Sequence, residues 1–287
     1  MNDKAATVAG LLGDAAHRLS HALGLPAREA RLETRVLAAF AWNVAPAWLI
    51  AHDTDPLDRG RHAAFEALLQ RRLAGEPVAY LTGVREFYGR PFRVSPDVLI
   101  PRPETELLVE LALARLPPDM PRAVLDLGTG SGCLAVTLAL ERPLTQVTAV
   151  DRSTAALAVA RDNAARLGAA VELIESDWFE GLAGRRFDII VGNPPYIAAA
   201  DPHLARGDVR FEPVSALAAG SDGLDDLRRL IAAAPTHLVR DGRLLLEHGY
   251  DQADAVRSLL AAHGFTQVAS WNDLAGIPRA SGGLLSE

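Results

Sequence analysis

An apolar segment, residues 124–127, runs into a loop with glycine at alternate positions and then into an apolar helical pattern over residues 133–141. Glycines at Gly128, Gly130 and Gly132 permit a tight turn and let backbone N–H groups approach a ligand closely. The start of the following helix adds the positive end of its dipole. A strand, a glycine loop and a helix in this order predict a ligand-binding turn at the edge of a parallel sheet.

The rest of the chain alternates between strand-like and helix-like patterns. Strands are expected at Gln146–Asp151, Val171–Asp177, Phe187–Asn193, Arg243–His248 and Phe265–Trp271. Helices are expected at Leu107–Leu116, Thr154–Leu167, Leu224–Val239 and Ala253–His263. This alternation predicts an α/β fold, a Rossmann-like, doubly wound parallel sheet. After Arg279 the sequence Ala-Ser-Gly-Gly-Leu-Leu-Ser-Glu is typical of a poor strand and does not support a firm final strand.

Two of the expected strands end in residues suited to a nucleotide. Asp151 lies 19 residues after Gly132, at the tip of the second strand, where an acid can bind the hydroxyl groups of a ribose. Asp177 and Trp178 end the third strand and place a carboxylate and a flat ring where an adenine would lie. The carboxyl ends of parallel strands share one edge of the sheet, so a nucleotide-like ligand is expected there.

The glycine loop favours S-adenosylmethionine over NAD. It reads Gly-x-Gly-x-Gly rather than Gly-x-Gly-x-x-Gly, which favours a ligand without a pyrophosphate. The residues expected to bind S-adenosylmethionine are Gly128, Thr129, Gly130, Ser131, Gly132, Asp151, Asp177, Trp178 and Asn193. No metal is expected, because Cys133 is the only cysteine and a Cys-cluster metal site needs several.

The sequence Asn193-Pro194-Pro195-Tyr196 begins at the end of the expected strand Phe187–Asn193. Its two prolines keep the chain extended as it leaves the sheet, so carbonyl groups stay free rather than entering a helix. These carbonyls and the Asn193 side-chain oxygen form an acceptor array that suits a planar NH2 group, as in an amide or a nucleobase amine. Tyr196 would stack on the face of that group. We therefore expect Asn193, Pro194 and Tyr196 to be catalytic, and all four residues to bind the substrate.

The front part of the chain has a different character. From about Ala5 to Gly75, apolar residues repeat at helical spacing, in sets such as Leu32, Val36, Leu37 and Phe40. Residues 87–94 alternate around a Gly-Arg-Pro turn and predict a hairpin. We expect a helical bundle over residues 1–76, which would suit contact with a partner, a hairpin linker over residues 77–100, and a methyl-transferring domain over residues 101–287.

Charge and hydropathy restrict the partners. The net charge of −7 argues against loose, charge-driven binding to nucleic acid. No apolar run is long enough to span a membrane, and residues 1–20 lack a signal-peptide pattern. We expect a cytoplasmic monomer that acts on neither nucleic acid nor membranes.

Three alternatives stay open on these residues alone. A nucleobase-amine methyltransferase would place an adenine amine in the acceptor array. A non-catalytic S-adenosylmethionine-binding module would keep the fold without the chemistry, although such a module has no need of an exposed Asn193-Pro194-Pro195-Tyr196. A dinucleotide oxidoreductase would use the loop for NAD.

Taken together, the motifs resemble those of the HemK/PrmC family, the glutamine-N5 methyltransferases of peptide chain release factors. The resemblance covers nearly the whole chain. Besides the glycine loop and Asn193-Pro194-Pro195-Tyr196, it rests on Phe87-Tyr88-Gly89, Leu99 to Glu106 (Leu-Ile-Pro-Arg-Pro-Glu-Thr-Glu), Gly207 to Pro213, Leu245 to Gly249 and Asp273 to Gly276. Pro-Arg-Pro-Glu-Thr-Glu and Arg-Phe-Glu-Pro separate this family from adenine-N6 methyltransferases better than Asn-Pro-Pro-Tyr does.

The resemblance implies methyl transfer from S-adenosylmethionine to the amide of the Gln in a Gly-Gly-Gln loop of a class 1 release factor, a step of protein methylation in translation termination. It also implies that residues 128–132, Asp151, Trp178 and Asn193 contact the cofactor, and that residues 193–196 hold the glutamine amide. The front domain would contact the release factor.

Overall fold

The structure, a computed structural model, describes residues 7–286 and forms two compact units. The first unit extends to Gly83 and also contains Ala205–Phe211, whereas the second comprises Val84–Leu204 and the chain from Glu212. Ala5, where the helical pattern begins in the sequence, lies outside the described residues. The predicted limits at residues 76 and 100 concern the roles of the domains and stay a prediction.

The first unit is helical. Its helices are α1 (Val8–Leu23), α2 (Ala27–Trp42), α3 (Pro46–Ala51), α4 (Arg59–Leu73) and α5 (Val78–Thr82). Side-chain caps begin two of them: the Thr7 hydroxyl accepts from Gly10 N, and the Asp58 carboxylate accepts from Arg61 N. Leu19, Leu37 and Phe65 are fully buried and lie in the core that these helices share.

Helix α2 forms where its apolar spacing predicts, but much of that apolar set faces outward. Leu32, Val36 and Phe40 are 64%, 39% and 49% exposed, and only Leu37 of the set is buried. Small residues make the inward face instead, among them Ala30, whose carbonyl accepts from the Thr34 hydroxyl. Close helix packing therefore selects small side chains here, and the large ones are left on the surface.

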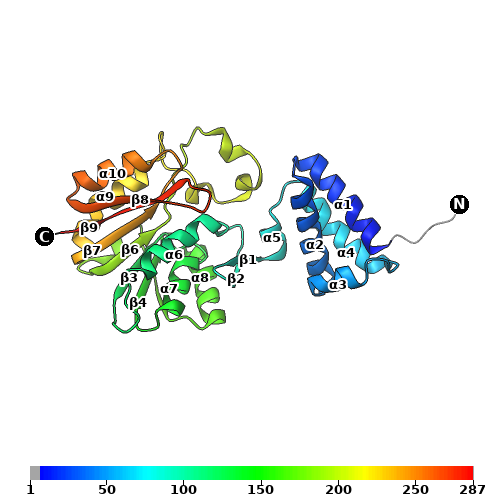
Figure 1. Ribbon diagram of the computed structural model, residues 1–287, viewed down its shortest axis with the longest axis horizontal. Coiled ribbons are helices and arrows are strands. Elements are labelled where there is room, and N and C mark those ends of the chain that lie inside the picture. The colour runs from blue at the N-terminus through cyan, green and yellow to red at the C-terminus, as the bar shows by residue number, and fades with distance from the viewer. Residues whose placement is uncertain (1–6, 287) are drawn as a thin grey trace. The chain divides into compact units, whose positions relative to one another are not determined.

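The second unit begins with a hairpin and continues as an α/β sheet domain (Figure 1). The hairpin pairs β1 (Val84–Phe87) with β2 (Arg90–Arg93). Its turn is Tyr88-Gly89, one residue earlier than the Gly-Arg-Pro turn expected, because both residues adopt the positive φ that a two-residue hairpin turn needs. The remaining strands are β3 (Ala123–Leu127), β4 (Gln146–Asp151), β5 (Val171–Glu175), β6 (Phe187–Gly192), β7 (Leu238–Glu247), β8 (Phe265–Asn272) and β9 (Pro278–Leu285). The helices are α6 (Glu106–Leu113), α7 (Cys133–Glu141), α8 (Thr154–Leu167), α9 (Asp225–Ala233) and α10 (Ala253–Ala262).

These strands form one seven-stranded sheet in the order β5-β4-β3-β6-β7-β9-β8, with helices on both faces (Figure 1). Side chains alternate between the two faces along each strand. In β6, Ile189 and Val191 pack in the core that contains α6 and α7, whereas Ile190 packs in the core with α9 and α10. The predicted doubly wound, Rossmann-like sheet is confirmed, with β9 antiparallel to its neighbours.

The end of α9 and the start of β7 differ from the sequence prediction because of one proline. The helix expected over Leu224–Val239 ends at Ala233, and a short 3-10 helix, Ala234–His237, follows. Pro235 lies in that 3-10 helix, where its missing N–H and its ring prevent the α-helix from continuing. Strand β7 consequently starts at Leu238, earlier than the expected Arg243.

The last strand corrects the expectation that the chain after Arg279 would not form one. Strand β9 pairs with β7 on one side and with β8 on the other. A Cβ atom on Gly282 would lie 2.3 Å from the Leu244 carbonyl oxygen, so the position has no room for a side chain. Ser281 next to it is buried and hydrogen-bonds His248 Nε2 at 2.7 Å, which gives that histidine a structural role. The glycines therefore reflect close packing.

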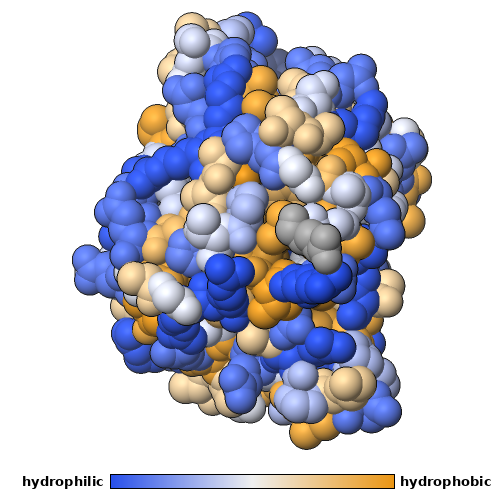
Figure 2. Space-filling view, turned by 90° about the vertical axis from the view of Figure 1, so that its left-hand side faces the viewer, coloured by the Kyte–Doolittle hydropathy of each residue, from blue (hydrophilic) through white to orange (hydrophobic). Residues whose placement is uncertain are grey.

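The surface around the C-terminal side of the molecule mixes hydrophilic and hydrophobic residues in small groups (Figure 2). Within residues 7–286, no helix combines the length and the apolar character needed to cross a membrane.

Candidate active site

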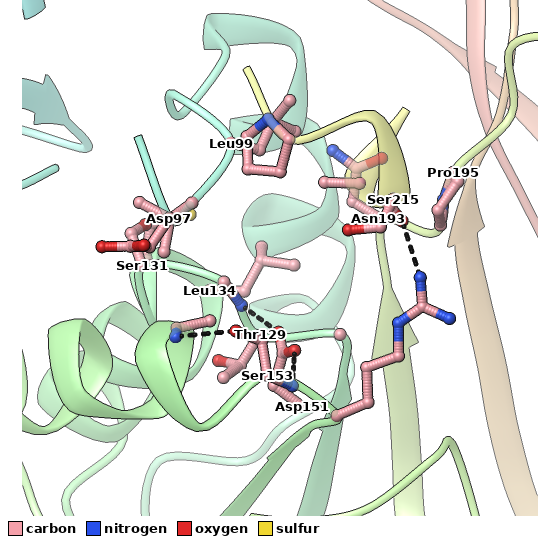
Figure 3. Close-up of a pocket in the computed structure, with 18 of the residues that line it drawn as sticks. Asp97, Leu99, Thr129, Ser131, Leu134, Asp151, Ser153, Asn193, Pro195 and Ser215 are labelled. Carbon is pink, nitrogen blue, oxygen red and sulfur yellow. Dashed lines mark hydrogen bonds between the residues drawn. The ribbon is translucent and has the colours of Figure 1, made fainter. Parts of the chain in front are cut away.

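A cavity of about 320 Å³ opens at the carboxyl ends of β3, β4, β5 and β6, within the second unit. The ends of these strands and the loops after them supply Gly128–Ser131, Asp151, Asp177, Trp178, Asn193 and Pro195 to its wall. Figure 3 labels Thr129, Ser131, Asp151, Asn193 and Pro195 among the lining residues. Of the residues predicted for the site, Gly132, Pro194 and Tyr196 do not line this cavity. The structure thus places most of the predicted cofactor set and one end of the Asn-Pro-Pro-Tyr segment around one space.

The glycine loop is shaped by backbone angles that favour glycine. Gly128, Gly130 and Gly132 have φ of 70°, 54° and 81°. A Cβ atom on Gly128 would lie 3.1 Å from the Trp178 ring, and one on Gly132 would lie 3.1 Å from Ala160 Cβ. The loop can therefore approach both the ring and helix α8 closely, which leaves the cavity between them open.

Asp151 is fixed by backbone groups and faces the cavity (Figure 3). Its Oδ2 accepts from Gly130 N at 2.9 Å, and its Oδ1 accepts from Ser153 N at 2.9 Å. Each carboxylate oxygen can accept more than one hydrogen bond, so both oxygens keep the capacity to bind a further donor. A vicinal diol supplies two such donors.

Trp178 has a φ of 52°, which is unusual for a large side chain. The Ser176 hydroxyl donates to the Trp178 carbonyl at 2.9 Å, and Trp178 Nε1 donates to Asp226 Oδ1 at 3.1 Å. These bonds hold the ring against the cavity despite the backbone cost. The neighbouring Asp177 carboxylate accepts hydrogen bonds from Arg229, so part of its capacity is already used.

Beneath the loop, Asp126 is a buried carboxyl group. Burial raises its pKa to about 7, although the Thr129 hydroxyl donates to its Oδ2 at 2.6 Å and favours the charged form. Its other oxygen, Oδ1, has no hydrogen-bond partner within residues 7–286. Asp126 thus anchors the loop from below without lining the cavity.

Asn193 reaches the cavity wall from the end of β6 (Figure 3). Its Nδ2 donates to the Thr105 hydroxyl at 3.2 Å, which directs its oxygen away from Thr105. Tyr196 is turned elsewhere: its hydroxyl donates to Glu247 Oε1 at 3.3 Å, and burial raises the pKa of this phenol. Stacking of Tyr196 on a substrate amide stays a prediction.

Sequence reasoning missed the residues that join distant segments around the cavity. Glu212 accepts from Ile100 N at 3.0 Å and pairs with Arg102, which lines the cavity. Thr105 also lines it and is 3% exposed. The prolines around Arg102 favour a place for it near the glycine loop, and it does line the cavity, but its pairing with a residue 110 positions away leaves no local pattern in the chain.

Family models match both units. The model described as PrmC N-terminal domain matches residues 11–83, and the one described as Methyltransferase small domain matches residues 104–207. Among solved structures, a methyltransferase from Pyrococcus furiosus matches 76% of this chain and 98% of its own at a TM-score of 0.53 and 16% identity. At that identity, the likeness supports the class I methyltransferase fold alone.

Curated relatives are much more similar. Release factor glutamine methyltransferase of Bordetella pertussis is 54% identical, over 91% of this chain and 96% of the relative. The protein of that name from Pseudomonas aeruginosa is 53% identical over 87% and 91%, and that from Escherichia coli is 46% identical over 85% and 88%. With both family models and relatives of this identity along nearly its full length, the chain belongs to the HemK/PrmC family of release factor glutamine methyltransferases.

Proposed function

We propose that this protein transfers a methyl group from S-adenosylmethionine to the side-chain amide nitrogen (N5) of the glutamine in the Gly-Gly-Gln loop of class 1 peptide chain release factors. One observation supports this most directly. The Asn193 side chain lines the same cavity as Asp151 and the glycine loop, so an amide acceptor and a nucleoside site share one space. The names of the curated relatives point to the same substrate.

The residues of the cavity fit S-adenosylmethionine. Asp151 keeps two oxygens for the ribose hydroxyls, and the Trp178 ring offers a flat surface for the adenine. Gly128 leaves open the space that a side chain would fill beside that ring. When bound, the cofactor supplies a methyl group activated by a positively charged sulfur.

The protein's own contribution is to orient the amide nitrogen, whose lone pair is delocalised. Its two N–H groups would donate to Asn193 Oδ1 and to the Pro194 carbonyl, which fixes the amide plane and turns the nitrogen toward the methyl group. These hydrogen bonds strengthen as the nitrogen gains positive charge, so they favour the transition state over the bound substrate. The nitrogen would bond to the methyl carbon as the bond between that carbon and the sulfur breaks, which leaves a neutral thioether, S-adenosylhomocysteine. The amide proton would then leave to water.

The partner would be the release factor itself, contacted by the helical unit. The proposal includes a monomeric enzyme that does not act on free nucleic acid. Among the described residues, no cluster of His, Cys, Asp and Glu side chains is arranged to hold a metal ion, and the proposed chemistry needs none.

Transfer of radiolabelled methyl groups tests the proposal. The protein is incubated with labelled S-adenosylmethionine and one of three acceptors: a class 1 release factor, the same factor with the Gly-Gly-Gln glutamine changed to alanine, or a mixture of DNA and RNA. Label on the unchanged factor alone is the expected result. Label on nucleic acid alone would favour a nucleobase-amine methyltransferase, and label on the alanine variant would move the modified site elsewhere.

A further inference from the structure

The carboxyl group of Asp226 lies at the edge of the Trp178 ring. Asp226 belongs to the first turn of α9, 48 positions after Trp178 in the chain, and it lines the cavity. Trp178 Nε1 donates to its Oδ1 at 3.1 Å. An indole N–H is a donor only, so Asp226 is the acceptor and one of its oxygens is held at the ring. The carboxyl group therefore lies in the cavity wall, beside the flat surface that the proposed function assigns to an adenine.

The second oxygen of Asp226 keeps its capacity to accept. Within residues 7–286, Oδ2 makes no hydrogen bond, because the bond from Trp178 is made by Oδ1. Burial raises the pKa of this carboxyl group, whereas the Trp178 bond and the nearby Arg152 and Arg229 oppose that shift and favour the charged form. A charged carboxylate accepts hydrogen bonds and donates none. Oδ2 is thus an acceptor beside the ring that no group of the described residues occupies.

Asp177, the carboxyl group predicted from sequence for this part of the site, is engaged with an arginine. Arg229 Nη1 donates to Asp177 Oδ1 at 2.9 Å and to Oδ2 at 3.0 Å, and Arg229 Nη2 donates to Oδ2 at 3.0 Å. Asp177 also lines the cavity, but both of its oxygens already accept from this guanidinium. Of the two carboxyl groups next to the Trp178 ring, Asp226 is the one with a whole oxygen left for a ligand.

The amine of adenine is the group that such an acceptor recognises. Adenine carries acceptor nitrogens in its rings, and its 6-amino group is the hydrogen-bond donor of the base. A base that lies on the face of the Trp178 ring brings its own edge close to groups bound at the edge of that ring, and Asp226 is such a group. A carboxylate in this place accepts from the amine and opposes a base that presents an oxygen there.

We propose that Asp226 is a specificity-determining residue, which recognises the 6-amino group of the cofactor's adenine through Oδ2 while Trp178 holds it through Oδ1. The inference rests on the proposed function for the identity of the cofactor, and it adds a residue of α9 to the site. It concerns binding alone, so it is tested without a release factor.

Two ligands and a matched pair of variants isolate this hydrogen bond. The ligands are S-adenosylhomocysteine and its analogue with hydrogen in place of the 6-amino group, which keeps every ring nitrogen. Asp226→Asn keeps an oxygen for Trp178 Nε1 and directs its NH2 group to the place of Oδ2, since Trp178 can only donate. Asp225→Asn makes the same change at the neighbouring position, where the carboxylate pairs with Arg228 on the surface and does not line the cavity.

Calorimetric titration of each protein with each ligand gives the dissociation constants. In the wild type and in Asp225→Asn, we expect loss of the amine to weaken binding about tenfold or more, as for a hydrogen bond to a charged group. Asp226→Asn should bind S-adenosylhomocysteine about tenfold more weakly than the wild type does, because a donor now faces the amine. The same variant should bind the two ligands within about twofold of each other.

A preference for the amine that is as strong in Asp226→Asn as in the wild type would overturn the inference, and so would a wild type that binds both ligands equally. Asp177→Asn is the rival variant: if it loses the preference instead, the carboxyl group predicted from sequence recognises the adenine. Failure of the proposed function gives a different result, in which the preference depends on Asp226 but no methyl group reaches a release factor. A protein that binds neither ligand would overturn both proposals.

Discussion

Asn193 is the residue on which the proposed chemistry depends most. In the proposed mechanism, its side chain accepts a hydrogen bond that strengthens during methyl transfer, so Asn193→Ala should lower kcat on the order of a hundredfold. The loss is measured with saturating release factor and cofactor. Asn272→Ala, at an exposed position of β8, provides a matched control that should behave as the wild type. A kcat unchanged in Asn193→Ala would refute its role.

A second prediction concerns the effect of Glu247 on stability rather than on rate. Burial, with a smaller contribution from Glu104, raises the pKa of its carboxyl group to about 7, against the lowering effects of Thr105, Tyr196 and Arg279. Between the ordinary pKa of a glutamate and about 7, the Glu247 carboxyl is protonated in the folded protein but charged in the unfolded chain. The free energy of unfolding therefore decreases as pH rises toward 7, because the charged form must stay buried.

Glu247→Gln lacks this proton and should not show that decrease. Between about pH 5 and about pH 8, the wild type should lose on the order of 2 kcal/mol more stability than the variant, at about 1.36 kcal/mol for each unit of pKa shift. Urea unfolding of both proteins at the two pH values measures the difference. Parallel pH profiles would show that the pKa of Glu247 is close to its ordinary value.

For single residues, the local sequence predicts a functional position when the residue lies at the end of a recognisable strand. Asp151 and Gly128 follow strands that the apolar pattern reveals, and the structure places both at the cavity. Thr105 and Glu247 could not be found in this way. Each sits in an ordinary local context, and their hydrogen-bond partners, Asn193 and Tyr196, lie 88 and 51 positions away in the chain.

Among the elements, β9 has the least strand-like sequence and the tightest packing. A methyl group on Gly282 would meet the backbone oxygen of Leu244, which cannot move without breaking the sheet. Gly282→Ala should therefore lower the free energy of unfolding by about 3 kcal/mol or more.

Gly13→Ala makes the same chemical change in helix α1, where a Cβ atom meets nothing within 4 Å. That variant should gain about 0.5–1 kcal/mol, since alanine is the better helix former. Chemical denaturation of both variants compares them directly. Equal effects at the two positions would mean that β9 accommodates a side chain and that its glycines need another explanation.

The elements were predictable where period and packing agree. Helices α7 and α8 and strand β4 have the bounds expected from sequence, because apolar periodicity and burial coincide in them. Strand β9 was not predictable, since close contact with a neighbouring backbone replaces the branched side chains that mark most strands. The buried face of α2 could not be predicted for the converse reason: the spacing of apolar residues does not show which face of a helix packs against the core.

For the whole molecule, the long segment after Asn193-Pro194-Pro195-Tyr196 does not stay within one unit. The chain leaves the sheet unit after Leu204 and returns at Glu212, and residues 205–211 are part of the helical unit. Within that unit, Arg72 donates to Asp208 Oδ1 at 2.8 Å. It also bonds Glu33 through Nε at 2.8 Å and Nη2 at 3.1 Å.

Arg72 is 2% exposed, and it compensates a Glu33 carboxyl whose pKa is raised by burial. Arg72→Met should therefore leave a buried acid without its partner and release the segment around Asp208, at a cost of about 3 kcal/mol or more in the helical unit. The neighbouring Arg71 pairs with Glu76 on the surface, so Arg71→Met should cost less than about 1 kcal/mol.

Trypsin cleavage after Arg206 and Arg210 reports on the segment itself and should accelerate only in Arg72→Met. Equal cleavage rates in the two variants would mean that Arg72 does not hold residues 205–211, and that their place in the helical unit depends on other contacts, such as the one from Arg210 Nη2 to the Ala74 carbonyl at 2.6 Å.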